Sequence, residues 1–218
     1  MSPPTTTYDL DTPLGPGRAQ VCRPPRARGV LAIGHGAGPN STTVDLIATR
    51  DAAVAQGWAV ALIEQPWLVA GRRVAPRPVV LDQAWVPMVR SLLARRGPLA
   101  RVPGPLVVAG RSAGARVACR TAAELDAYAA VCLSFPLHPP GRPERSRADE
   151  LALPLAAGRS VGVIQGERDP FGTPDELITL APAPDPVIAV PGTHTIPARA
   201  AAAVAEAVRV VLAAVGSE

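Results

Sequence analysis

Short apolar runs alternate with helix-like segments along almost the whole chain, and this order constrains the fold more than any other feature. Each run is rich in valine, isoleucine, leucine and alanine, which is typical of strands buried on both faces of a sheet. Neighbouring parallel strands need a crossover between them, and that crossover is usually a helix. The runs that we interpret as strands cover residues 29–35, 58–64, 106–109, 129–133, 161–165 and 187–190.

The segments between these runs carry the signals of helices. Thr42 and Asp45 predict an N-terminal capping box for a helix over 41–56. Thr173 and Glu176, with a proline directly after the threonine, predict the same start for a later helix. The sequence therefore predicts an α/β protein, a three-layer α/β/α sandwich around a mostly parallel sheet.

Two further helices are expected because apolar side chains recur on one face at helical spacing. The first has the positions Leu81, Trp85, Met88, Val89 and Leu92. Pro87 lies among them and predicts either a kink or the true start of that helix. The second, at the end of the chain, has the positions Val204, Val208, Val211 and Val215.

The length and composition favour one domain with its own core. The chain has 218 residues, of which 48% are hydrophobic. We expect the domain over residues 19–218, with 1–18 as an N-terminal extension or an edge segment. No run of eighteen apolar residues occurs, so no membrane span is expected. The N-terminus is polar and proline-rich and lacks the pattern of a signal peptide, which favours a cytoplasmic location.

The charge pattern argues against a nucleic-acid partner. The net charge is +4, every basic residue is an arginine, and these arginines are scattered rather than clustered. Aromatic residues make up only 3% of the chain, so no stacking platform for single strands is expected. The sequence leaves the oligomeric state open.

The three cysteines, Cys22, Cys119 and Cys132, are interpreted as buried free thiols. Their number is odd, their spacing is wide, and their surroundings are apolar or helical. A reactive cysteine would need a neighbour that stabilises the thiolate, and the sequence shows none. We expect neither a metal nor another cofactor.

The pentapeptide Gly110-Arg111-Ser112-Ala113-Gly114 stands where a predicted strand meets a helix expected over 112–125. A tight strand-to-helix turn crowds the backbone, and glycines two residues before and after the serine relieve that crowding. The turn would expose the Ser112 hydroxyl at the carboxyl end of a strand, where sites form in parallel sheets. The Ala113 N–H and the positive helix end would favour an oxyanion there. The motif predicts a nucleophile; the plain alternative is a turn without chemistry.

A serine nucleophile needs a general base, and the chain offers three histidines. In folds with a nucleophile elbow, as this kind of strand-to-helix turn around a serine is called, the order along the chain is serine, acid, histidine. His35 precedes the serine, and His138 follows it too soon for a strand between them to supply the acid. His194 lies after the last predicted strand and before the last helix, so we expect it to be the base.

The acid should follow the strand over 161–165. Asp169 is the best candidate, because an Asp-Pro turn directs the carboxylate away from the following helix, and Glu167 is the reserve. The plain alternative for Asp169 is a turn-forming residue.

The loop "IGHGAGPNS" is expected to supply the second oxyanion donor. Its glycines allow the backbone to approach a reacting centre closely. We choose the N–H of Ala37, with Gly36 next, and expect His35 to orient the loop by hydrogen bonding. A dinucleotide-binding loop is the rival interpretation, but Pro39 stands where the third glycine should be, and a phosphate-binding loop of the Walker type needs a lysine.

The stretches "GHGAG", "AGRSAG", "LSFPLHPPG", "QGERDPFG" and "GTH" occur in this order and at characteristic spacings. With them the chain resembles the α/β-hydrolase superfamily on its dienelactone-hydrolase-like side. It is most similar to a small group that includes testis-expressed proteins and a chromatin NSL-complex subunit. The resemblance covers about residues 19–215. It implies an α/β-hydrolase fold without a large lid domain and the roles of nucleophile, acid and base for Ser112, Asp169 and His194.

These observations predict a serine hydrolase that cleaves an ester-type bond, thioesters and lactones included, in a small-molecule substrate. The alternative is an interaction module that kept the fold without catalysis, and acyl transfer by the same residues is a third reading. We expect residues 135–149 to cross the mouth of the site as a short cap, with His138 near the serine. Trp67 is expected to form the opposite wall, and Arg111 is expected to contact the substrate.

Overall fold

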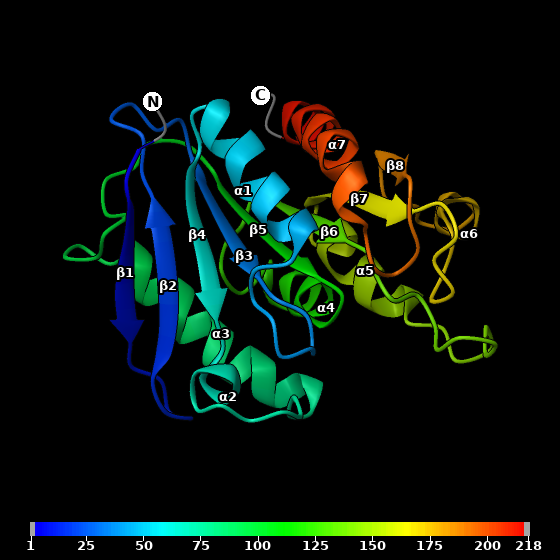
Figure 1. Ribbon diagram of the computed structural model, residues 1–218, viewed down its shortest axis with the longest axis horizontal. Coiled ribbons are helices and arrows are strands. Elements are labelled where there is room, and N and C mark those ends of the chain that lie inside the picture. The colour runs from blue at the N-terminus through cyan, green and yellow to red at the C-terminus, as the bar shows by residue number, and fades with distance from the viewer. Residues whose placement is uncertain (1–2, 216–218) are drawn as a thin grey trace.

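A computed structural model describes residues 3–215 and shows one eight-stranded sheet, in the order β1-β2-β4-β3-β5-β6-β7-β8 (Figure 1). Strands β3 to β8 run parallel to one another, whereas β1 and β2 form an antiparallel pair at one edge. The strands are β1 Thr5–Leu10, β2 Gly17–Cys22, β3 Val30–Gly34, β4 Ala59–Glu64, β5 Leu106–Arg111, β6 Ala129–Leu133, β7 Ser160–Gly166 and β8 Val187–Val190.

Helices cover both faces of the sheet, which makes three layers (Figure 1). Helices α1 and α7 lie together on one face, and α3, α4 and α5 lie on the other. The helices are α1 Val44–Ala55, α2 Pro66–Val69, α3 Pro78–Leu93, α4 Ala113–Thr121, α5 Ala148–Ala156, α6 Pro174–Ile178 and α7 Ala201–Val215, with a 3-10 turn at Ala198–Ala200. The predicted fold class is therefore confirmed. Within the described residues, no helix is both long enough and apolar enough to cross a membrane.

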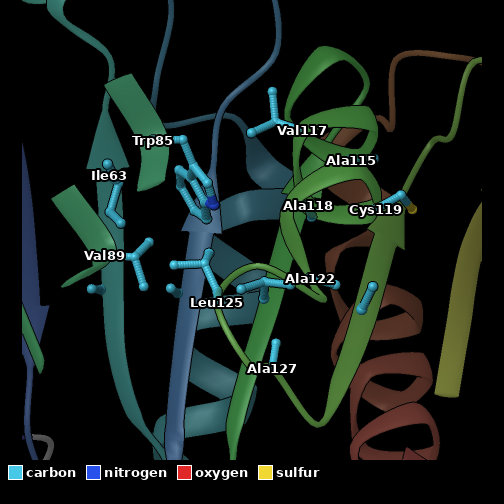
Figure 2. Packing of buried hydrophobic residues seen from close by; sticks show 14 of the residues in the cluster. Ile63, Trp85, Val89, Ala115, Val117, Ala118, Cys119, Ala122, Leu125 and Ala127 are labelled. Atoms are coloured by element: carbon cyan, nitrogen blue, oxygen red, sulfur yellow. The ribbon is translucent and has the colours of Figure 1, made fainter. Parts of the chain in front are cut away.

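The core forms two layers because side chains alternate across the central strands. In β3, Leu31 and Ile33 pack with α1 and α7, whereas Val30 and Ala32 pack on the other face. Figure 2 shows the second layer, where Trp85 of α3 lies between Ile63 of β4 and the residues of α4. Both layers are fully buried, so the sheet is a rigid platform for the loops at its edge.

The six predicted strands are all present within two residues of their expected ends. The edge strands β1 and β2 were missed, since β1 is polar and mostly exposed and so lacks an apolar run. The boundary expected after residue 18 falls inside β2, and the division into an extension and a domain stays a prediction. Helix α5 was missed as well; it carries Pro154 in its interior.

The helix starts show one correct and one wrong prediction. Thr173 and Glu176 form the expected capping box at α6. The box predicted from Thr42 and Asp45 is wrong, because α1 begins at Val44 and the Asp45 carboxylate takes other partners.

The two helices expected from apolar spacing are both present, as α3 and α7. Pro87 lies inside α3 and does not mark its start, since that helix begins at Pro78. Val204, Val208 and Val211 are buried as predicted, and the side chain of Val215 lies outside the described residues.

Candidate active site

Ser112 occupies a strained turn between β5 and α4. Its backbone lies in the left-handed region, at φ 52°, which is unusual for a residue with a side chain. A Cβ atom at Gly110 would lie 2.2 Å from the backbone of Gly114, and one at Gly114 would lie 2.6 Å from the carbonyl oxygen of Gly34. Glycine is therefore required on both sides of the serine by packing, as the motif predicts.

His194 joins the serine to the acid. Its Nε2 lies 2.8 Å from the Ser112 hydroxyl, and its Nδ1 lies 2.9 Å from a carboxylate oxygen of Asp169. An ionised carboxylate only accepts, so Nδ1 carries the proton and donates, and Nε2 is left to accept from the serine. Three segments that are far apart in the sequence thus meet at the carboxyl ends of β5, β7 and β8.

The Asp169 carboxylate is buried and held by several donors. Its second oxygen accepts the backbone N–H of Phe171 at 2.8 Å, and the amide nitrogen of Gln165 lies 3.0 Å from the oxygen that faces His194. Glu167, the reserve acid, is exposed at the surface. The structure therefore brings Asp169, and not Glu167, to the histidine.

The imidazole of His194 is also covered on one face. The ring of Phe171 lies 4.3 Å from it, centroid to centroid, at an angle of 36°. Only 18% of the His194 side chain is exposed. A ring in this position limits the rotation of the imidazole and reduces the access of water to it.

The loop after β3 lies beside the serine and is oriented by His35. A Cβ atom at Gly36 would lie 3.6 Å from the Cβ of Ser112. His35 donates from Nδ1 to the Gly36 carbonyl at 2.7 Å and accepts the Gln65 N–H at Nε2. Burial lowers the pKa of His35, which keeps this neutral arrangement. The expected orienting role of His35 is confirmed by these bonds, and Ala37 follows in an exposed position.

The other oxyanion candidate, Ala113, is the first residue of α4. The N–H groups of a first helical turn have no acceptor within the helix, and the helix dipole adds positive character there. Ala113 and the Gly36–Ala37 loop thus both adjoin Ser112, although their role as oxyanion donors stays a prediction.

The three predicted substrate contacts lie in different surroundings. Trp67 is buried and packs against the ring of His35 at 5.4 Å, and together with Gly36 and Gly114 it lines a cavity of about 10 Å³. His138 directs its ring nitrogens to the Pro139 carbonyl and to Glu176, each at 3.0 Å. The Arg111 side chain turns inward, to Asp45 and to the backbone of His194.

The segment 135–149 differs from the expected cap. Its first residues, Phe135, Leu137 and His138, are buried, and the N–H of His138 donates to the Phe171 carbonyl. The exposed residues 140–146 extend outward at the right edge of Figure 1, away from α4 rather than across it. The predicted cap is wrong in this respect, because the turn after β6 packs on the loop after β7.

Sequence reasoning missed three residues that support the site, namely Asp45, Gln165 and Phe171. Asp45 was assigned to a helix cap, and Gln165 was read only as the end of a strand. Phe171 belongs to the "QGERDPFG" stretch, where an aromatic residue two positions after the acid was a usable signal.

A protein-family comparison matches the chain over residues 26–195 to a model described as an alpha/beta hydrolase domain. This match spans most of the chain, and the protein belongs to the alpha/beta hydrolase family. A comparison with curated protein sequences finds no match.

Solved structures with the same fold include several hydrolases. An α/β serine hydrolase without lid from Xanthomonas campestris has a TM-score of 0.73 at 20% identity, covering 98% of this chain and 96% of that one. A dienelactone hydrolase from Anabaena variabilis has a TM-score of 0.72 at 19% identity, covering 98% and 99%. Est1E from Butyrivibrio proteoclasticus has a TM-score of 0.72 at 15% identity, covering 97% and 99%. At these identities the likeness shows the fold.

The resemblance stated from the sequence is thus confirmed at the level of the superfamily. The finer likeness to the testis-expressed and NSL-complex group stays a prediction.

Proposed function

We propose that this protein is a serine hydrolase that cleaves an ester-type bond through an acyl-enzyme intermediate. The observation that carries the proposal is the hydrogen-bonded chain from Ser112 through His194 to Asp169. A structural serine has no need of a base at hydrogen-bond distance, a buried carboxylate behind that base and a strained backbone. The three features together are the arrangement of an activated nucleophile.

The chemistry follows from the atoms that face one another. The Ser112 oxygen attacks the substrate carbonyl while His194 Nε2 takes its proton. The imidazolium then gives that proton to the departing alcohol or thiol, and the acyl group stays on the serine. In the second half, a water molecule attacks the acyl carbonyl while His194 Nε2 takes a proton from it. The carboxylic acid then leaves, and Ser112 regains its proton from His194. Asp169 remains ionised and stabilises the imidazolium.

The negative charge that forms on the carbonyl oxygen needs donors beside Ser112. The N–H groups of Ala113 and Ala37 are proposed for this role, with Gly36 as the reserve, because both segments adjoin the serine. Preorganised donors of this kind stabilise the transition state more than the ground state.

The substrate class is proposed from the neighbours of the fold. Neighbours of the fold include proteins described as a dienelactone hydrolase and as a carboxylesterase. We therefore propose a small ester, with thioesters and lactones in the same class. The interaction-module alternative has no specific observation in its favour.

The test uses hydrolysis of p-nitrophenyl acetate and labelling by a fluorophosphonate probe, which reacts with activated serines. Ser112→Ala and His194→Ala should each lower turnover by about a thousandfold or more, with folding intact. The label should be lost in Ser112→Ala. Ser160→Ala is the matched control, because Ser160 is exposed at the opposite end of β7. A folded wild-type protein that takes no label and hydrolyses no ester would favour the interaction module.

A further inference from the structure

Arg111 connects three segments that surround the nucleophile. It lies directly before Ser112, at the end of β5. Its Nε donates to the Asp45 carboxylate of α1 at 2.9 Å, and its Nη2 donates to the backbone carbonyl of His194 at 2.7 Å. The guanidinium also packs against the loop after β3, since a Cβ atom at Gly36 would lie 2.9 Å from Nη1.

We propose that Arg111, held by Asp45, is the positioning residue for the base loop of this enzyme. The inference rests on the proposed function, because it assigns Arg111 to the support of His194 as base. By binding the His194 carbonyl, Arg111 would hold the imidazole at the distance where it accepts the Ser112 proton. By packing on Gly36, it would also set the position of the oxyanion loop. This role replaces the substrate contact expected from the sequence.

The geometry suits an arginine and no other cation. The guanidinium is planar and presents Nε and Nη2 in a rigid fork, so one side chain can bind a carboxylate and a carbonyl in fixed relative positions. A lysine ammonium is a single point charge on a flexible stem and does not impose that relation. Hydrogen bonds with an ionised partner are also stronger than neutral ones.

The ion pair between Arg111 and Asp45 is largely shielded from solvent, which strengthens it. Only 14% of the Arg111 side chain and 3% of the Asp45 side chain are exposed. The Asp45 carboxylate accepts further from the Thr43 hydroxyl and from the N–H of Leu46, so its own position is held by the start of α1. The ion pair therefore transmits a fixed position from α1 to the loop that carries His194.

A positioning residue should act on turnover more than on binding. We expect Arg111→Met to lower kcat for p-nitrophenyl acetate by about 10–100-fold while KM changes less than about threefold. Arg111→Lys should recover part of this loss. Asp45→Asn should lower kcat less than Arg111→Met does, and the double variant should be no worse than Arg111→Met alone, because both changes break one interaction.

Arg120→Met is the matched control. The Arg120 side chain is likewise 14% exposed and pairs with a carboxylate, that of Asp82, but it lies farther along α4 and binds α3. This variant should leave kcat within about twofold of wild type, since it changes no group beside the serine.

A second measurement reads the position of His194 without turnover. The chain has only three histidines, so the imidazole N–H signals in a 15N-histidine NMR spectrum can be assigned by substitution. The His194 Nδ1 proton, bonded to Asp169, should exchange with water at least about tenfold faster in Arg111→Met than in wild type and unchanged in Arg120→Met.

The kcat measurement and the proton-exchange measurement distinguish a failure of the proposed ester hydrolysis from a failure of the proposed positioning by Arg111. If wild type hydrolyses no ester, the proposed function fails, while the exchange experiment still tests the positioning. If Arg111→Met changes neither kcat nor the exchange of the His194 proton more than Arg120→Met does, the positioning role is overturned. If Arg111→Met does not fold, Asp45→Asn and Arg111→Lys decide by the same criteria.

Discussion

Two clusters of arginine and carboxylate involve helices on opposite faces of the sheet, and they differ in what they connect. On the side of α1, Arg111 joins Asp45 to the His194 loop. On the other side, Glu150 of α5 binds Arg116 and Arg120 of α4, at 2.7 and 3.2 Å.

The second cluster extends to Asp82 of α3, which binds Arg120 at 2.7 Å. It therefore ties three neighbouring helices together, and its ion pairs join side chains of α3, α4 and α5, not those of Ser112, Asp169 or His194. We infer from the comparison that one kind of interaction, an arginine paired with a shielded carboxylate, can serve either the geometry of a site or the stability of a helix layer. Its partners decide which.

The largest predicted difference comes from removing one carboxylate charge at the proposed catalytic site, which the Arg111 cluster adjoins, and one in the second cluster. Asp169→Asn should lower kcat by about 10³–10⁴-fold, because an asparagine does not hold His194 in the tautomer that accepts from the serine. Ester hydrolysis at neutral pH measures the effect.

Glu150→Gln is the matched change in the second cluster and should leave kcat within about twofold of wild type. A loss of activity in Glu150→Gln comparable to that in Asp169→Asn would contradict the separation of the second cluster from the proposed catalytic site.

The second prediction concerns the stability of the helix layer. Burial alone would raise the pKa of Glu150, but the bonds from Arg116 and Arg120 outweigh it and lower the pKa below its usual value of 4.5. Glu150→Gln should therefore reduce the free energy of unfolding by about 1–3 kcal/mol at pH 7, since the Glu150 side chain is only 16% exposed. Urea unfolding of both proteins measures the difference.

The sign of its pH dependence follows from the lowered pKa. A carboxyl group whose pKa is lower in the folded state contributes stability above its unfolded value, and the contribution disappears as the pH falls through the folded value. The gap between wild type and Glu150→Gln should thus be largest near neutral pH and shrink below pH 4.5. A gap that grows on acidification would refute this account.

The smallest predicted effect concerns His138, whose nitrogens bind Pro139 and Glu176. The hydrogen bond to the Pro139 carbonyl, followed by the contact with Glu176, raises the pKa of His138 above 6.5. The Thr173 backbone N–H, followed by His138, lowers the pKa of Glu176 below 4.5. Between pH 4.5 and pH 6.5, His138 is therefore protonated and Glu176 is ionised, so the two form a charged pair.

His138→Gln should cost about 0.5 kcal/mol of unfolding free energy near pH 5.5, because the pair is partly exposed. Stability from a raised histidine pKa is complete below 6.5 and is lost as the pH rises through the folded value. The cost should therefore decrease by pH 8. Thermal unfolding at the two pH values measures it, and an equal cost at both would show that packing, and not charge, is responsible.

The sequence was most informative where local physics decides the outcome. The central strands are buried on both faces and so appear as continuous apolar runs, and the capping box at Thr173 closes within four residues. The elbow at Ser112 was equally readable, because a Cβ atom at Gly110 would meet the backbone of Gly114 within the turn itself; the crowding at Gly114 comes from Gly34 of the neighbouring strand. The same order of elements placed Asp169 and His194 at strand ends, where the structure brings them together.

The edge strand β1 and the loop over residues 135–149 could not be predicted from local sequence in this way. Strand β1 has no apolar run, since most of its side chains face solvent and its position depends on pairing with β2. Residues 135–149 carry many prolines and charges, which predict a loop but not its direction. Whether such a loop crosses the site or turns outward depends on what its buried end, at Phe135 and Leu137, packs against.

The α/β layering and the turn at Ser112 could be predicted because burial periodicity and backbone crowding act over a few residues, and the order of strands then gave the order of the proposed catalytic residues. The pairing of Asp45 with Arg111, 66 residues apart, and of Arg111 with His194, 83 residues apart, depends on tertiary packing. No local pattern marks such pairs, since an arginine next to a nucleophile can face a substrate or the protein equally well. The packing of α1 and of the His194 loop around the end of β5 brings the Arg111 side chain to Asp45 and to the His194 carbonyl.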